Sequence, residues 1–419
     1  MRTIYIHFSA YIDKAKYILL ALLPLILLFL SSCKKDDNSQ TLCDPTPQFN
    51  IDLFIQNVNE ALNDPANPVA GYQFTVNQNG NLYHAEAGGK SVYASDPGGP
   101  VEMTEFVRMN VASVSKFIGT IALMQVLEKH GIEETELIRE YLPQRWKDGM
   151  HTDHYEASSV NKVTFEKMLQ MKTGLRYSAD NTNWSPGIMP TTDQMYTAIT
   201  LPADPARVDK YQNGNFTLIR VLITEMEYGL DASDPEYNFM TAEAYFDYIK
   251  RNIFDKLGID APMTISAINN YYDNTAFTRA HQYPFDSTFR DGNNNVGWGA
   301  SSDPELNGGS GGLVLSSMDL AKVLAYFIHD NATIISKDQR EIILEKDLGL
   351  WGTGSGDHGK YSSKGGTRGP ETDFNRAIQS MVMMFPNGVE AVLLVNSNKT
   401  DNGSTLRIAF DEAWVSPCN

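Results

Sequence analysis

Residues 113–130 read SVSKFIGTIALMQVLEKH, and most of this stretch is apolar. It predicts one long helix that begins with the pattern Ser-x-x-Lys. Ser113 and Lys116 stand three positions apart, so they share one helix face and the amine can reach the hydroxyl. A serine hydroxyl is a weak nucleophile until a base takes its proton, and a helix N-terminus favours the developing negative charge. The stretch therefore indicates Ser113 as a candidate nucleophile with Lys116 as its base.

A second motif, Tyr211-Gln212-Asn213, stands before the apolar stretch 216–222. A tyrosine held beside a lysine can have a lowered pKa and act as a base. The Asn213 amide offers a donor and an acceptor to a substrate amide. Each motif has a rival match elsewhere in the chain, at Ser159-Val160-Asn161-Lys162 and at Tyr272-Asp273-Asn274. The alternatives are a helix-capping serine at 113 and a buried tyrosine with a turn asparagine at 211.

The third motif, Lys364-Gly365-Gly366-Thr367, follows the predicted strand 359–363. Small residues such as Gly366 let a substrate lie against a strand edge. We expect Lys364 to be an accessible positive charge that favours substrates with a carboxylate, the alternative being electrostatic support of Tyr211 only. The backbone N–H of Thr367 is expected to form an oxyanion hole with that of Ser113. Lys172-Thr173-Gly174 is a rival match for this motif.

The rest of the sequence predicts a sheet that is built from both chain ends. Strands are predicted at 71–76, 81–93, 377–385 and 389–395, with turn signals inside each pair. Helices are predicted at 50–63 and 404–415, and helical pieces broken by loops occupy about 140–330. This arrangement favours an α/β fold with a mainly helical second lobe.

The three motifs in this order resemble those of the penicillin-recognising serine hydrolases. The tyrosine of the second motif points to the branch of the class C β-lactamases, D-alanyl-D-alanine carboxypeptidases and related esterases. Segments 106–131, 140–143, 163–175 and 311–320 also resemble conserved segments of that family. The departures are Met171 in place of a usual histidine, Gln212 in the second motif, and Pro205-Ala206 in place of Pro-Gly.

The resemblance implies an α/β, β-lactamase/transpeptidase-like fold with an antiparallel sheet from both termini, flanked by helices, and a helical lobe. It implies an acyl-enzyme on Ser113, proton transfer by Lys116 and Tyr211, and substrate binding by Asn213, Lys364, Gly366 and Thr367. The expected substrates are D-Ala-type peptides or β-lactams, without cofactor or metal. The alternatives are an esterase of the same family and a binding or sensor lipoprotein that does not turn over.

The N-terminus predicts export and lipid attachment. Basic residues precede the apolar run 17–30, which is too short for a comfortable membrane span, and Leu30-Ser31-Ser32-Cys33 resembles the lipobox of bacterial lipoproteins. We predict a signal peptide over 1–32, an acylated Cys33 with a polar tether over 33–48, and a hydrolase domain over 49–419. The protein would be lipid-anchored in the bacterial envelope, on the periplasmic side or at the cell surface.

Composition limits the remaining options. The formal net charge of −17 argues against nucleic-acid binding. The eight histidines form no His-x-x-x-His pair, so the sequence indicates no metal site. Gly308-Gly309-Ser310-Gly311-Gly312 fits the nucleophile elbow of α/β-hydrolases, but a loop precedes it where that motif needs a strand. We expect a monomer, and a disulfide between Cys43 and Cys418, because the resemblance places the first and last helices side by side.

Overall fold

The computed structural model describes residues 46–150, 159–177, 189–274, 276–286, 297–370, 376–399 and 402–417. The chain divides into two units, Asn50–Trp414 and the two chain ends. In the described part of the ends, β1 (Gln48–Phe49) pairs with β13 (Trp414–Val415). The signal peptide, Cys33, Cys43 and Cys418 lie outside the described residues, so lipid attachment and the disulfide stay predictions. No helix among the described residues is long and apolar enough to cross a membrane.

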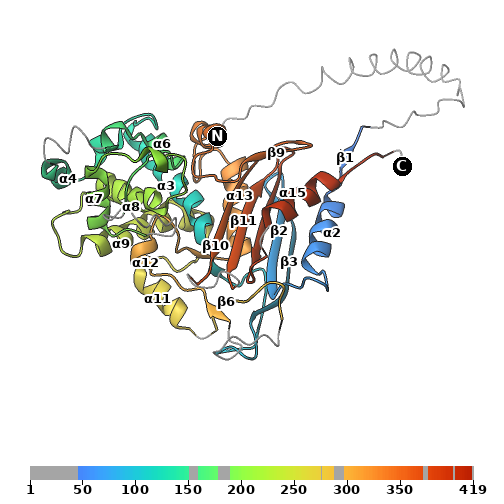
Figure 1. Ribbon diagram of the computed structural model, residues 1–419. Helices are drawn as coiled ribbons and strands as arrows, with labels where there is room; N and C mark the ends of the chain where they lie inside the picture. Colours follow the sequence, from blue (N-terminus) through green and yellow to red (C-terminus); the bar gives the residue numbers. More distant parts are fainter. Residues whose placement is uncertain are drawn as a thin grey trace, which may run out of the picture. The chain divides into compact units, whose positions relative to one another are not determined.

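The centre of the larger unit is a seven-stranded sheet in the order β4-β3-β2-β12-β11-β10-β9 (Figure 1). Its described neighbours all pair antiparallel. The strands are β2 (Gly71–Gln78), β3 (Asn81–Val92), β4 (Val101–Glu102), β9 (Gly354–Gly356), β10 (Gly359–Arg368), β11 (Ile378–Met384) and β12 (Val389–Val395). Because β12 pairs with β2, the sheet joins both ends of the chain, as the sequence predicts.

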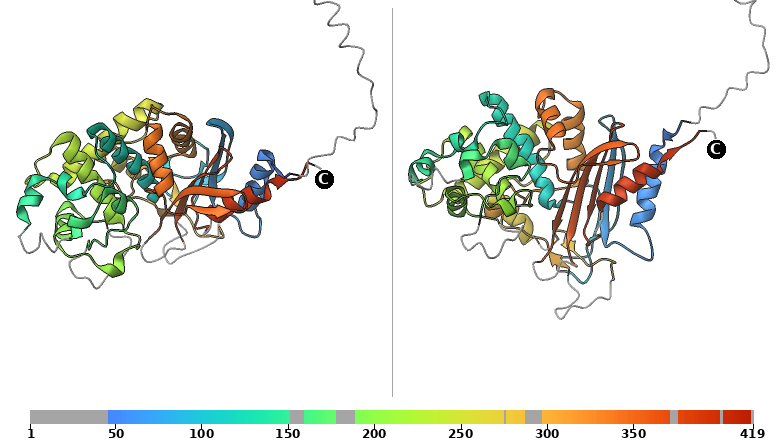
Figure 2. Two further views of the ribbon diagram at one scale, coloured as in Figure 1. Left: turned by 90° about the horizontal axis from the view of Figure 1, so that it is seen from above. Right: turned by 45° about the horizontal axis from the view of Figure 1, so that its top comes forward.

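Helices cover both faces of this sheet. The first and last helices, α2 (Ile51–Leu62) and α15 (Asn402–Glu412), lie together on one face, and α13 (Ser317–His329) packs on β2 and β12 from the other (Figures 1 and 2). Phe54 of α2 meets Phe74, Phe385 and Phe410 edge to face, which ties α2 to the sheet and to α15. The fold is therefore an α/β fold with a central antiparallel sheet flanked by helices, as the sequence predicts.

The remaining helices gather beside the sheet around α3 (Ser115–His130), which is buried on nearly every side (Figure 1). The α-helices there are α4 (Gln144–Gly149), α6 (Phe165–Leu169), α7 (Thr192–Thr200), α8 (Asn213–Tyr228), α9 (Tyr237–Ile249), α10 (Asp255–Leu257), α11 (Ile265–Asp273), α12 (Pro304–Asn307) and α14 (Lys337–Lys346). The short helical turns are η1 (Ala112–Val114), η2 (Ile138–Tyr141), η3 (Ser159–Lys162), η4 (Pro205–Arg207) and η5 (Lys250–Phe254). Four two-residue strands form two further pairs, β5 (Met109–Asn110) with β8 (Val314–Leu315) and β6 (Arg279–Ala280) with β7 (Trp298–Gly299). The bounds of the helical lobe, about 140–330, stay a prediction, as do those of the domains.

Two differences from the sequence-based expectation concern the candidate site. Ser113 lies in the 3₁₀ turn η1 rather than in the first turn of α3, which begins at Ser115. Strand β10 continues through Arg368, so the third motif is inside the strand and not after its end. The pairing of Lys364–Arg368 with β11 explains the longer strand, because a paired neighbour satisfies backbone groups that the glycines alone would leave open.

Candidate active site

Strand β10 passes directly against the turn that carries Ser113. A Cβ atom at Gly366 would lie 2.7 Å from the Ser113 nitrogen and 2.7 Å from the Val111 oxygen, closer than real Cβ atoms approach. On β11, opposite Gly366, the Ser380 hydroxyl donates to the Val111 oxygen at 2.7 Å. The glycine of the third motif therefore lets strand and nucleophile turn meet.

The turn that presents Ser113 has an unusual backbone. Ala112 has φ of +46°, in the left-handed region that a residue with a Cβ rarely adopts. The Ala112 N–H donates to the Asn110 side-chain oxygen at 2.7 Å, and the Asn110 amide donates to the Tyr272 hydroxyl at 2.8 Å. Such strained residues persist where the surroundings hold them and are common at active sites. Tyr272, the rival tyrosine, thus supports the turn and does not contact the Ser113 hydroxyl.

Two side chains from distant parts of the sequence converge on the Ser113 hydroxyl. The Lys116 amine donates to Ser113 Oγ at 2.9 Å, and the Tyr211 hydroxyl donates to the same oxygen at 2.7 Å. Lys116 also donates to the backbone oxygen of Ser310, which fixes the direction of the amine. Ser113 itself is half-buried, so a substrate can reach it. Ser113, Lys116 and Tyr211, which the sequence predicts from two short motifs, are therefore within hydrogen-bond distance of one another through the Ser113 oxygen.

Burial controls the protonation of this cluster. Lys116 is fully buried, which holds its pKa well below the ordinary value, and the nearby Lys364 charge lowers it further. Burial raises the pKa of Tyr211 to about 12, opposed by its hydrogen bond with Ser113. The expected lowering of the tyrosine pKa is therefore wrong, because burial of the hydroxyl dominates, and the same burial lowers the pKa of both neighbouring lysines. Burial therefore favours the uncharged amine of Lys116, and Tyr211 keeps its proton at neutral pH.

Lys364 is not the accessible charge that the sequence indicated. Its side chain is 2% exposed, with Nζ 5.5 Å from the Tyr211 ring centroid and donating to the Gly365 oxygen at 2.7 Å. Burial lowers the pKa of Lys364 to about 7, so its charge is partial at neutral pH. The amine is buried because Lys364 lies inside β10 and its amine is over the Tyr211 ring. This position fits the alternative in which Lys364 supports the tyrosine.

The other predicted substrate-binding residues border the cluster. Asn213 is the buried first residue of α8, two positions after Tyr211. Thr367 is exposed on β10, next to Gly366 and opposite Gln379 of β11. Their contacts with a substrate, and the oxyanion hole of Thr367 and Ser113, stay predictions.

The rival motifs are placed elsewhere or in other roles. Lys172 is exposed after the end of α6, while Thr173 next to it donates to Asn215 at 2.8 Å. Ser310 is buried, follows helix α12 instead of a strand, and its hydroxyl is paired with Met189 and Asn307. A nucleophile elbow also needs a histidine, and His329 and His358, which follow Ser310 in the sequence, contact Glu390 and Trp414. Within the described ranges, no group of acidic, histidine and cysteine side chains could hold a metal ion.

Three groups that hold the catalytic cluster in place were not predicted from the sequence. Asn110, Ser380 and the backbone oxygen of Ser310 hold the turn and the lysine, yet none belongs to a motif. Only Asn110 leaves a local signal, because an asparagine often accepts from a backbone N–H two residues on. The other two depend on strand register and on packing between distant segments.

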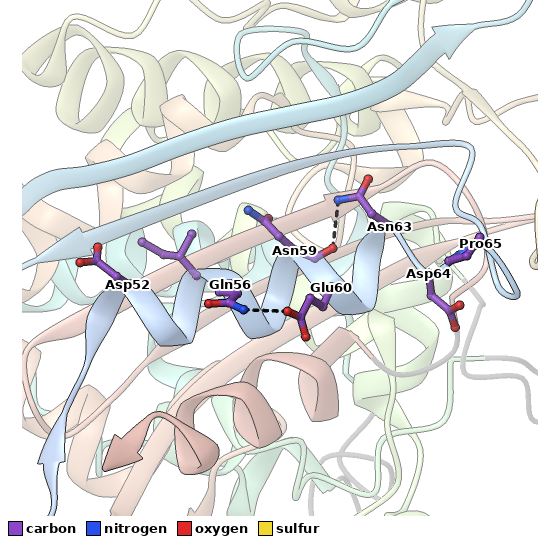
Figure 3. Close-up of a pocket in the computed structure, with 8 residues that line it drawn as sticks. Asp52, Gln56, Asn59, Glu60, Asn63, Asp64 and Pro65 are labelled. Carbon is purple, nitrogen blue, oxygen red and sulfur yellow. Dashed lines mark hydrogen bonds between the residues drawn. The ribbon is translucent and has the colours of Figure 1, made fainter. Parts of the chain in front are cut away.

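A hollow of about 740 Å³ on the opposite side of the sheet belongs to a different region (Figure 3). It is lined by α2 and the turn after it, through Asp52, Ile55, Gln56, Asn59, Glu60, Asn63, Asp64 and Pro65. Its polar side chains hydrogen-bond along the helix, as Gln56 does to Glu60 at 2.8 Å. Its lining contains no paired nucleophile and base like those at Ser113.

This fold, with a serine, a buried lysine and a tyrosine between sheet and helices, is that of a class of serine hydrolases. A family model described as Beta-lactamase matches residues 56–412, and the chain therefore belongs to the beta-lactamase family. Among curated proteins, the sequence comparison finds no match.

Solved structures share this fold at low sequence identity. The octameric penicillin-binding protein homologue from Pyrococcus abyssi has a TM-score of 0.60 and 16% identity, covering 86% of this chain and 76% of the other. A D-stereospecific amidohydrolase from Streptomyces has a TM-score of 0.54 and 16% identity over 85% and 98% of the two chains. A class C beta lactamase from Rhodobacter sphaeroides has a TM-score of 0.54 and 12% identity over 86% and 98%. The similarity concerns the fold, and the monomeric state of this chain stays a prediction.

Proposed function

We propose that this protein hydrolyses amide bonds of D-alanyl-type peptides or β-lactams through an acyl-enzyme on Ser113. The observation that carries the proposal is the convergence of the Lys116 amine and the Tyr211 hydroxyl on one Ser113 oxygen. The families of a D-stereospecific amidohydrolase and a class C beta lactamase with the same fold support the choice of substrate class.

The protonation states suggest how the groups share the work. Lys116, whose burial favours the uncharged amine, takes the Ser113 proton as the oxygen attacks the substrate carbonyl. Tyr211 keeps its proton at neutral pH and donates it to the departing group, and the proton held by Lys116 then restores the tyrosine. In the second half of the reaction a water molecule takes the place of the departing group: Tyr211 passes its proton to Lys116 and accepts one from the water as the water attacks the acyl group. Lys116 then returns a proton to the Ser113 oxygen as the acyl group leaves. Asn213, Gly366 and Thr367 would position the substrate beside the cluster.

Tyr211→Phe is expected to lower kcat by about 10²–10⁴-fold with little change in KM, because it removes a proton donor and retains the ring. Steady-state kinetics on the purified protein would measure both constants. The control is Tyr272→Phe, which removes a hydroxyl bonded to Asn110 rather than to Ser113 and should cost much less. A larger loss in the control would transfer the role to Tyr272.

A second candidate function, an esterase, is favoured by the burial of Lys364, because a buried amine offers a substrate carboxylate little exposed charge. Nitrocefin, a D-Ala-D-Ala peptide and a p-nitrophenyl ester should be compared on the wild type and on Lys364→Met. We expect the variant to lose activity by a similar factor, on the order of 10-fold or more, on charged and neutral substrates. A loss confined to carboxylate substrates would return Lys364 to substrate binding.

The same panel separates turnover from binding. Faster cleavage of the peptide or nitrocefin than of the ester supports the proposed substrate class, and the reverse order supports the esterase. Stoichiometric acylation by a β-lactam without release would instead identify a binding or sensor protein.

A further inference from the structure

One large aromatic side chain is exposed beside the catalytic cluster. Trp351 is 43% exposed, and its ring centroid lies 5.6 Å from that of Tyr211 with the rings nearly perpendicular, at 82°. Exposed tryptophans are costly to leave in water, and an aromatic wall beside a reactive group is a usual part of a ligand site. No sequence motif singled out this residue.

The backbone on both sides of Trp351 is held in place. Trp351 forms a backbone bridge with Lys364 of β10, and the Ser363 hydroxyl donates to the Gly352 oxygen at 2.8 Å. Gly349, with φ of +67°, packs so tightly on α3 that a Cβ there would lie 2.0 Å from the Thr120 hydroxyl. The indole is therefore mounted on a fixed segment, and a substrate that contacts it loses little freedom in ordering it.

The position of Trp351 relative to Tyr211 indicates which part of a substrate it contacts. Under the proposed function, the Tyr211 hydroxyl gives its proton to the departing group, so that group must lie on the tyrosine's side of Ser113. Trp351 packs against the same tyrosine ring, and its remaining surface is open. We propose that Trp351 is a specificity-determining residue that forms the wall of the leaving-group site, so that of two substrates with the same acyl group it favours the one whose leaving group is aromatic or bulky and apolar. The inference rests on the proposed function.

Two acetate esters test this assignment, because they transfer the same acyl group and differ only in what departs. Phenyl acetate has an aromatic leaving group and trifluoroethyl acetate a small aliphatic one. The value of kcat/KM reports the step in which that group leaves, and intrinsic reactivity cancels when one variant is compared with another. In Trp351→Ala we expect the ratio of phenyl to trifluoroethyl kcat/KM to fall about 10- to 30-fold. Trp351→Phe should restore most of the ratio.

The control is Tyr326→Ala, which removes an aromatic ring of similar exposure, 36%, on helix α13. It should leave the ratio unchanged. An equal loss of both esters in Trp351→Ala would mean that the indole only supports Tyr211, and an unchanged ratio would remove it from the site; either result overturns the inference. The same two esters on Ser113→Ala test the proposed function separately: undiminished hydrolysis by that variant would remove the acyl-enzyme on Ser113, and the inference would fail with it.

Discussion

Ser113→Ala is expected to abolish covalent labelling by a fluorophosphonate probe and to lower hydrolysis by at least about 10³-fold. The reason is that Lys116 and Tyr211 both point their hydrogen-bonding groups at this one oxygen, and alanine leaves them without an atom to activate. Labelling followed by mass spectrometry, with the thermal melt measured in parallel, would separate loss of the nucleophile from loss of the fold. The melt should change little, because Ser113 is half-buried and alanine fits the turn.

Ser310→Ala provides the matched control. It removes the hydroxyl of the rival nucleophile but keeps the backbone oxygen that accepts from Lys116. Labelling should persist in this variant. The assignment of Ser113 would be overturned if the label survived in Ser113→Ala and disappeared in Ser310→Ala.

Lys116→Met is expected to inactivate the protein and at the same time to raise its melting temperature at pH 7. Burial holds the pKa of Lys116 in the folded chain well below 10.5, the value of a lysine in the unfolded chain, which is protonated at neutral pH. Protonation therefore favours the unfolded state at every pH below about 10.5, and the wild type carries this cost at neutral pH. Replacement of a buried ion pair by apolar residues is often stabilising by ~1–4 kcal/mol, and a gain of that order would raise the melting temperature of a domain of this size by roughly 1–5 °C.

The pH dependence distinguishes this cause from improved packing. The advantage of Lys116→Met should shrink as the pH rises toward 10.5, since the unfolded wild type then loses its proton too. The control is Lys346→Met, because Lys346 pairs with Glu134 at 2.6 Å and with Glu166 at 2.8 Å, and these carboxylates raise its pKa. That variant should melt lower than the wild type. Scanning calorimetry at several pH values measures both effects, and a lower melting temperature for Lys116→Met would contradict the argument.

Local patterns in the sequence predict most of the strands and helices that form the central sheet and cover one of its faces. Apolar patterns and turn signals placed β2, β3, β11, β12, α2 and α15 within a few residues. Strands β2, β11 and β12 are buried along almost their whole length, and α2 buries one face, so these elements carry apolar residues at the spacing of a strand or a helix. The hairpin turns, with Asn79 and Gly80 both at positive φ, carry their own chemical signal. The length of β10 escaped this reasoning, because its glycines gain their strand conformation from pairing with β11.

By itself, the sequence determined the architecture, the family and the two short motifs that contain Ser113, Lys116 and Tyr211. It could do so because residue spacing along a helix or strand depends on local backbone geometry. Only the tertiary structure decided the pKa values of the site, where burial raises that of Tyr211 and lowers those of Lys116 and Lys364. It also decided the placement of Trp351 beside Tyr211. The physical reason is that pKa values and substrate walls depend on burial and on neighbours far apart in the chain, and spacing along the sequence does not encode burial at a single polar residue.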